Sequence, residues 1–271
     1  MTGRVALLCL FITACARPTT PTPLTDALIQ LATMWGDEPV SDLLVREQLD
    51  HMASRVRDLA AARQGPMREL LKRVVFKEQG FTREVHDTAL RYVLLPSVLR
   101  ARRGSCVGLS SLYLALAERL GLDMHAVLVP GHFYVNLHVG QHRHNLELLR
   151  EGESMPDSFY LTRWPIHAAS AAYGRPLRAD EVQGVVLFDI GKELQRARAL
   201  HRAERAYLLA GQRFRAFGEA HASAGSVAHL LGALDRAESA YALAKAVHPE
   251  LPGLRANIAL LRAERGSSPN D

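Results

Sequence analysis

The apolar positions in the first half of the chain follow the period of an α-helix. Between Ser41 and Gln64, five apolar residues recur every three or four positions, which predicts an amphipathic helix. These residues are Val45, Leu49, Met52, Val56 and Leu59. Residues 66–79 predict a second helix, which Gly80 ends. We expect both helices to form scaffold around a site rather than the site itself.

A third helix follows the segment Arg102-Arg103-Gly104-Ser105-Cys106-Val107-Gly108-Leu109 and is closed by Gly121. Its apolar stripe has the spacing of one buried helix face. The stripe consists of Leu109, Leu112, Tyr113, Leu116, Ala117 and Leu120. Cys106 is therefore expected at the N-terminus of a buried helix.

After Gly121 the period changes from that of a helix to the two-residue period of strands. Residues 125–129 predict a strand that Pro130-Gly131 ends, and residues 132–139 predict a second, half-buried strand with His132 on its more polar face. Gly140-Gln141 suits a tight turn, after which residues 143–149 return as the partner strand. If the turn holds an even number of residues, His132 and Glu147 share a face one diagonal step apart; an odd turn separates them.

The C-terminal region changes in composition to Ala, Leu and Arg from about Gly184. Residues 201–210 are similar to residues 235–244 at an offset of 34, which is the period of the tetratricopeptide repeat. In the second unit, Ala237 and Ala244 permit close helix contact and Tyr241 fills the space between helices. The alternative is an alanine-rich helical hairpin without repeat ancestry.

The overall composition is that of a globular protein, with 48% apolar and 23% charged residues. The net charge of +5 comes largely from dispersed Arg, without a basic stripe interleaved with aromatic residues. This indicates a weak bias towards anionic surfaces and argues against nucleic-acid binding.

The N-terminal residues have the pattern of an export signal. Arg4 precedes an apolar run, Val5 to Ile12, that is too short to span a membrane. Residues Ile12-Thr13-Ala14-Cys15 resemble the lipobox of bacterial lipoproteins, which implies cleavage before Cys15 and lipidation of its thiol. By the same resemblance, Ala16 after the cysteine favours the outer membrane. The alternative is an ordinary signal whose cleavage site happens to lie near a cysteine.

Cys106 is then the only thiol of the mature protein, because Cys9 leaves with the signal and Cys15 carries lipid. No intrachain disulfide can form. At a helix N-terminus the unpaired N–H groups and the macrodipole favour a thiolate, which is one route to a nucleophilic cysteine. The alternative for a lone cysteine in this position is a small buried apolar residue.

A histidine and a carboxylate follow Cys106 in the order that thiol chemistry needs. His132 can remove the thiol proton, and Glu147 can orient the imidazole and stabilise its cation. The segments Arg-Arg-Gly-Ser-Cys-Val-Gly-Leu-Ser, Leu-Val-Pro-Gly-His-Phe-Tyr-Val and His-Asn-Leu-Glu resemble the core of the transglutaminase-like superfamily, in its SirB-related branch, over about residues 70–180.

This resemblance implies a papain-like α+β fold and acyl transfer by a Cys, His, Asp triad. Carried over, Cys106 becomes the nucleophile and His132 the base, while Glu147 replaces the commoner Asp. Asn145, on the same strand face, is the alternative orienting group. The Cys106 backbone N–H could supply one oxyanion donor, and the sequence assigns no second donor.

Three further histidines cluster around the expected hairpin, at His138, His142 and His144. Their spacing is not that of a zinc site, and no nearby Cys or Asp completes a tetrahedral set. We therefore expect neither a metal nor another cofactor, and interpret these histidines as surface residues.

The sequence thus predicts four parts: a lipoprotein signal (1–15), a Pro- and Thr-rich tether (16–25), a transglutaminase-like domain (26–182) and tetratricopeptide-like repeats (184–266). The expected fold class is α+β, with helices packed on a small antiparallel sheet, followed by an all-α array. Residues 158–180 either line the cleft or only cover the core.

The leading functional hypothesis is a lipid-anchored cysteine enzyme of the cell envelope that hydrolyses or transamidates a peptide or protein amide. The repeats would bind a protein partner. The alternative is an inactive adaptor that holds a partner in the papain-like cleft and on the repeats.

Overall fold

The computed structural model describes residues 23–86, 89–166 and 170–267. The expected signal, the lipidation site at Cys15 and most of the tether lie outside these residues. Among the residues described, no helix is both long enough and apolar enough to cross a membrane.

Helices form most of the first half of the described chain. They are α1 (Leu24–Trp35), α2 (Asp42–Ala61), α3 (Met67–Lys72), the π-helical turn η1 (Arg73–Glu78), the 3₁₀ turn η2 (Leu90–Tyr92), α4 (Leu95–Ala101) and α5 (Cys106–Leu120). The predicted apolar stripe of α2 is confirmed, since all five residues are buried. The predicted helix over residues 66–79 is present as α3 continued by η1.

The main sheet has four antiparallel strands in the order β3-β4-β5-β6. They are β3 (Met124–Val129), β4 (His132–Val139), β5 (His142–Glu147) and β6 (Glu153–Met155), with the 3₁₀ turn η3 (Leu148–Arg150) before β6. Val139 pairs with His142, so the turn between β4 and β5 holds two residues. This even number puts His132 and Glu147 on one face of the sheet.

A second, two-stranded sheet pairs β1 (Thr82–Arg83) with β2 (Arg103–Gly104) in parallel, immediately before α5. Ser105 then begins α5, because its hydroxyl accepts a hydrogen bond from the Gly108 N–H. Gly121 ends α5 in the left-handed conformation, with φ of 63°. Both ends of α5 are thus fixed by the residues predicted to flank it.

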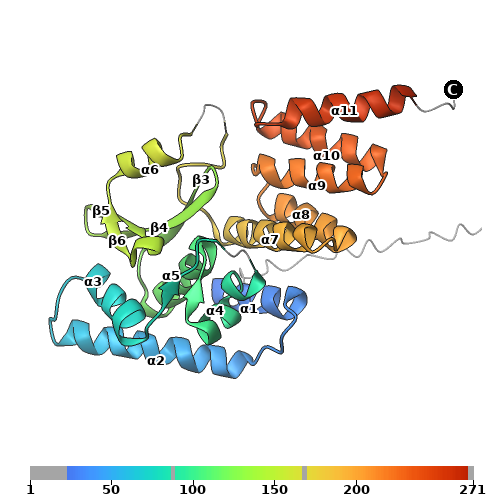
Figure 1. Cartoon of the computed structure of the whole chain (residues 1–271). Coiled ribbons are helices and arrows are strands. Elements are labelled where there is room, and N and C mark those ends of the chain that lie inside the picture. Colours follow the sequence, from blue (N-terminus) through green and yellow to red (C-terminus); the bar gives the residue numbers. More distant parts are fainter. Residues whose placement is uncertain (1–22, 87–88, 167–169, 268–271) are drawn as a thin grey trace, which may run out of the picture.

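Both faces of the main sheet are covered. Helix α5 packs on one face, and α6 (Asp157–Arg163) lies over the other (Figure 1). The expectation of a half-buried β4 is therefore wrong, since its residues 132–137 are all buried. Tyr160 and Trp164 cover the face of the sheet opposite α5. They belong to a segment whose sequence has no clear period.

Five further helices follow the sheet, each packed against the next. They are α7 (Ala179–Arg196), α8 (Leu200–Arg213), α9 (Gly218–Leu230), α10 (Leu234–Val247) and α11 (Leu254–Ser267). Figure 1 shows them as a stack that starts on the core at α7 and ends at α11. The boundary expected between residues 182 and 184 falls inside α7, which also contacts α1.

The helical region repeats its packing at an offset of 34 residues. A Cβ on Gly191 would lie 2.6 Å from the ring of Tyr207, and one on Gly225 would lie 2.6 Å from the ring of Tyr241. Only glycine allows the two helices to approach so closely at these points. The pairs α7–α8 and α9–α10 therefore pack in the same way.

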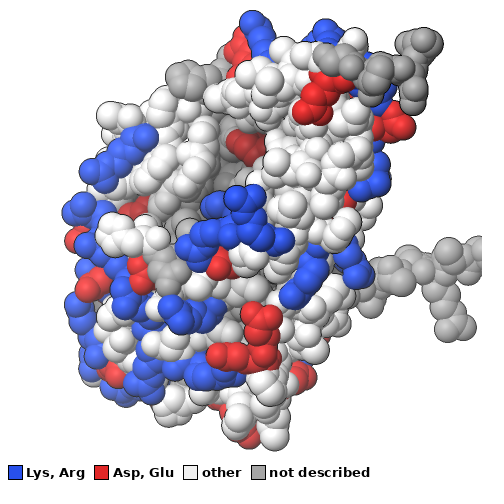
Figure 2. Space-filling model, turned by 45° about the vertical axis from the view of Figure 1, so that its right-hand side comes forward, with Lys and Arg blue, Asp and Glu red and all other residues white. Residues whose placement is uncertain are grey.

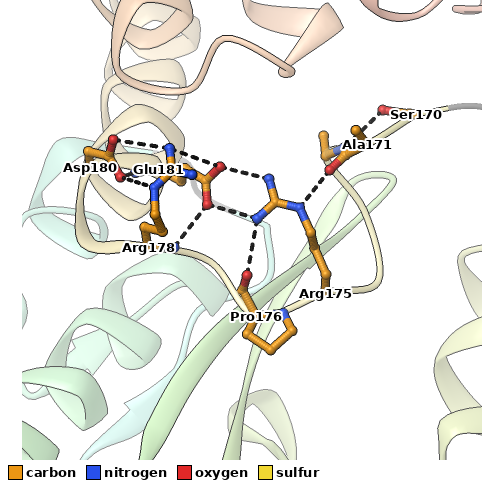
Figure 3. Close-up of polar contacts among 8 residues, drawn as sticks. Ser170, Ala171, Arg175, Pro176, Arg178, Asp180 and Glu181 are labelled. Carbon is orange, nitrogen blue, oxygen red and sulfur yellow. Dashed lines mark hydrogen bonds and ion pairs between the residues drawn. The ribbon is translucent and has the colours of Figure 1, made fainter.

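A polar network holds the segment that leads into α7 (Figure 3). The guanidinium of Arg175 donates to both carboxylate oxygens of Glu181, at 2.8 and 2.7 Å, and also to the carbonyls of Ala171 and Pro176. Glu181 in turn accepts the backbone N–H of Arg178, at 2.9 Å. The network fixes the start of α7 relative to the connection from the sheet.

Candidate functional site

Cys106 is the first residue of α5, and the local sequence explains its position. A Cβ on Gly108 would lie 2.2 Å from the carbonyl oxygen of Tyr92, so any larger residue would push α5 away from this loop. The Ser105 N–H also donates to that carbonyl, at 2.8 Å. Gly108 therefore allows the start of α5, with Cys106, to pack directly against the preceding turn.

The thiol of Cys106 lies beside the start of β4. Cys106 as a whole is half-buried, and the backbone N–H of Phe133, the residue after His132, is close enough to lower the pKa of its thiol. Cys106 and His132 also line the same cavity. The structure thus brings together the helix start and the strand start that the sequence analysis selected.

His132 and Glu147 form a buried hydrogen-bonded pair. The distance between His132 Nε2 and Glu147 Oε2 is 2.7 Å, and the two residues are only 5% and 2% exposed. The other carboxylate oxygen, Glu147 Oε1, accepts the N–H of Leu149 at 3.0 Å. Since Nε2 is occupied by Glu147, Nδ1 is the ring nitrogen that can exchange a proton with a thiol.

Asn145, the alternative orienting group, points to different partners. Its amide donates to Asp157 Oδ1 at 2.7 Å and to the carbonyl of Met155 at 3.3 Å. These bonds hold β5 to β6 and to the start of α6. Of these two candidate orienting groups, Glu147 is the one that is hydrogen-bonded to His132.

An aromatic cover shields the His132–Glu147 pair from solvent. The ring of Trp164 stacks on the imidazole of His132, with centroids 4.0 Å apart and planes inclined by 9°. The ring centroid of Tyr160 lies 6.3 Å from that of the same imidazole. Because water is excluded, the hydrogen bond between imidazole and carboxylate is stronger than it would be at the surface. Sequence reasoning missed this role for Trp164.

The environment of Cys106 favours the thiol over the thiolate. Its pKa is raised to about 12, first by burial and then by the carboxylate of Asp189, while the Phe133 N–H and Lys192 act to lower it. The sequence had indicated a thiolate favoured by the helix N-terminus, and the structure does not support this expectation. Exclusion of water outweighs the helix dipole here, so the thiol needs a base at neutral pH.

A cavity of about 240 Å³ opens beside the cysteine. Most of its wall is apolar and comes from two parts of the chain. Val107, Leu128 and Phe133 belong to the core, whereas Val185, Phe188 and Phe217 belong to the helical region. Tyr173 also lines the cavity, so residues 158–180 contribute both to the cleft and to the cover over His132.

The three histidines of the hairpin lie closer to the β4–β5 turn than His132 and Glu147 do: His138 and His142 are close to the turn, and His144 pairs with Leu137. Within the described ranges, no three His, Cys, Asp or Glu side chains are grouped so that they could hold a metal ion. His144 is partly buried, and this burial lowers its pKa.

Comparison with known proteins places the site residues inside a matched region. A family described as the Transglutaminase-like superfamily matches residues 44–165, which include Cys106, His132 and Glu147. A curated UPF0162 protein of Xylella fastidiosa (strain 9a5c) is 27% identical over 168 residues, which cover 60% of this chain and 50% of that protein. The match therefore spans about half the length of that relative. No solved structure matches the chain.

Proposed function

We propose that this protein is a cysteine acyl-transfer enzyme in which Cys106 is the nucleophile, His132 the base and Glu147 the group that positions His132. The observation that carries the proposal is the buried 2.7 Å contact between Glu147 and His132, which lines the same cavity as Cys106. The similarity of residues 44–165 to the Transglutaminase-like superfamily supports the same chemistry.

We infer the following order of events. His132 Nδ1 takes the thiol proton as Cys106 Sγ attacks an amide carbonyl, because a thiol with its pKa near 12 does not ionise by itself. The Glu147 carboxylate stabilises the imidazolium that forms. Collapse of the tetrahedral intermediate breaks the C–N bond, and His132 returns the proton to the leaving amine. Attack by water or a second amine on the thioester then regenerates the thiol.

The backbone N–H of Cys106 can stabilise the oxyanion of this intermediate. As the first residue of α5, Cys106 has an N–H without a partner in its own helix. Such donors at a helix start stabilise a developing negative charge. The substrate class we propose is a peptide or protein amide, by hydrolysis or by transfer to an amine.

We further propose that the helical region is a tetratricopeptide-type array in a SirB-related protein. Support comes from the two glycine–tyrosine contacts at an offset of 34 residues, in α7–α8 and in α9–α10. Such arrays bind extended segments of protein partners.

Membrane anchoring through lipid on Cys15 is proposed from the sequence pattern of residues 1–15, with the outer membrane as the expected location. Labelling of cells with an alkyne-bearing fatty acid tests it directly. Label should be incorporated into the full chain and absent from Cys15→Ser; label that persists in the variant contradicts the anchor.

The rate of alkylation of Cys106 tests the acyl-transfer proposal without knowledge of the substrate. The purified full-length chain is treated with iodoacetamide between pH 5 and 9, and modification of the Cys106 peptide is followed by mass spectrometry. We expect His132→Ala to slow alkylation at pH 7.5 by at least about tenfold, the lower bound of a general-base contribution. An equal rate in both proteins would refute the pairing of thiol and imidazole.

A further inference from the structure

The helical region contributes part of the wall around the candidate nucleophile. Val185, Phe188, Asp189 and Lys192 of α7 line the cavity beside Cys106, together with Glu219 from the first turn of α9. A hollow is visible near the middle of the face shown in Figure 2, with acidic and basic side chains at its rim. The cavity therefore depends on both parts of the fold.

Two of the residues that line this cavity each carry a polar atom without a hydrogen-bond partner in the described part of the chain. They are Oε2 of Glu219 and the hydroxyl of Tyr173, each fully shielded from solvent. The Tyr173 side chain as a whole is only 8% exposed. A buried polar atom without a hydrogen bond is destabilising, so a pair of them beside a reactive cysteine suggests a place for a ligand.

The charged side chains of the cavity indicate the charge of a ligand that would fit there. Lys192 Nζ binds Asp189 Oδ1 at 3.1 Å, and these two charges offset each other. No cation forms an ion pair with Glu219 among the residues that the structure describes, and burial raises the pKa of Glu219 to about 7. A cationic group placed against Glu219 would offset the free-energy cost of burying its carboxylate. The N–H donors of that group would also supply the hydrogen bond that Oε2 lacks.

We propose that this cavity is a pocket for a side chain of the substrate. The side chain it accepts is an alkyl chain that ends in an ammonium group, and Glu219 and Tyr173 bind that group. The apolar wall of Val107, Phe133 and Phe188 fits the alkyl chain. Glu219 is thus a specificity-determining residue of the site proposed above, contributed by the helical region.

Chloroacetamides with different tails test the pocket through the thiol beside it. The full-length protein is treated with chloroacetamides that carry a 4-aminobutyl, a pentyl or a 3-carboxypropyl tail, and with chloroacetamide itself as the reference. We expect the aminobutyl reagent to alkylate Cys106 at least tenfold faster than the carboxypropyl reagent. Glu219→Gln, which keeps the size of the side chain, should bring this ratio to within about threefold of one, and Tyr173→Phe should lower it severalfold.

Glu47→Gln is the matched control, because Glu47 is an exposed carboxylate in a different cavity and the change also removes one negative charge. It should leave the ratio unchanged. A ratio near one in the unaltered protein, or a ratio that survives Glu219→Gln, overturns the proposal.

A second measurement separates the pocket from the acyl-transfer proposal, on which its role in catalysis rests. Binding of butylamine to Cys106→Ala is measured by calorimetry, so that no reaction is needed. Binding that weakens at least tenfold in the Cys106→Ala, Glu219→Gln double variant supports the pocket even if Cys106 proves unreactive. Absence of binding, or equal binding by both proteins, overturns it.

Discussion

Glu147→Gln removes one charge from the buried pair while nearly preserving the shape of the side chain. Both neighbours of the carboxylate are donors, His132 Nε2 at 2.7 Å and the Leu149 N–H at 3.0 Å. A glutamine presents one oxygen and one NH₂ group, so one of these donors would face another donor. The imidazolium that forms during attack also loses its counter-charge.

The expected loss can be worked from these contacts. A hydrogen bond to a charged group contributes about 1.5–3 kcal/mol, which corresponds to roughly 10- to 150-fold in rate. Burial of both residues places the effect towards the upper end of this range. We therefore expect Glu147→Gln to slow reaction of Cys106 by about 100-fold.

The assay is the rate at which Cys106 is alkylated at pH 7.5, with the thermal unfolding midpoint measured alongside to verify folding. Glu153→Gln is the matched control, because Glu153 forms an exposed pair with Arg150 at 2.7 Å on the neighbouring strand. Exposed pairs contribute about 0–1 kcal/mol, so the control should react as the unaltered protein does. A folded Glu147→Gln protein that reacts within threefold of the unaltered rate would refute the role given to the carboxylate.

Three further predictions concern stability. Gly108→Ala should lower the free energy of unfolding by about 2–3 kcal/mol in urea titration, because its Cβ would meet the Tyr92 carbonyl at 2.2 Å; a change below 0.5 kcal/mol would count against this contact. The pKa of Glu219 is about 7 in the folded protein against an ordinary 4.5, so the folded state holds its proton more tightly. The stabilisation that Glu219 contributes is full below about pH 4.5 and is lost as the pH rises through 7, by at most about 3 kcal/mol. Glu219→Gln should flatten this fall; an unchanged pH profile would contradict the assignment. Arg175→Ala should cost roughly 2–3 kcal/mol, because the buried carboxylate of Glu181 loses its two short hydrogen bonds from a guanidinium and keeps only the longer ion pair with Arg178 at 3.6 Å and a backbone N–H. Glu181→Gln in the Arg175→Ala background should recover part of this loss; no recovery would show that the arginine acts otherwise.

The parts of the fold that depend on local periodicity followed from the sequence. The stripe of α2 could be predicted because burial on one helix face leaves a visible three- and four-residue spacing. The relation between His132 and Glu147 depended only on the number of residues in the turn at Gly140, since strand faces alternate with a period of two.

Features created by distant segments could not be read in this way. The raised pKa of Cys106 depends on its burial and on Asp189, which lies more than eighty positions along the chain. The burial of the polar face of β4 depends on Trp164, and the pocket wall on Glu219 of α9. The glycine partners Gly191 and Gly225 did leave a signal, because they recur at the same offset as the tyrosines they contact.

Transfer of an acyl group to Cys106 shows directly whether this thiol is a nucleophile that His132 activates. The full-length protein is mixed with p-nitrophenyl acetate at pH 7.5, and release of nitrophenolate is recorded together with the mass of the Cys106 peptide. We expect a burst of about one equivalent, an acetyl group on Cys106, and a burst rate at least tenfold lower in His132→Ala. A Cys106 that stays unacylated, or that is acylated equally fast without His132, would contradict it.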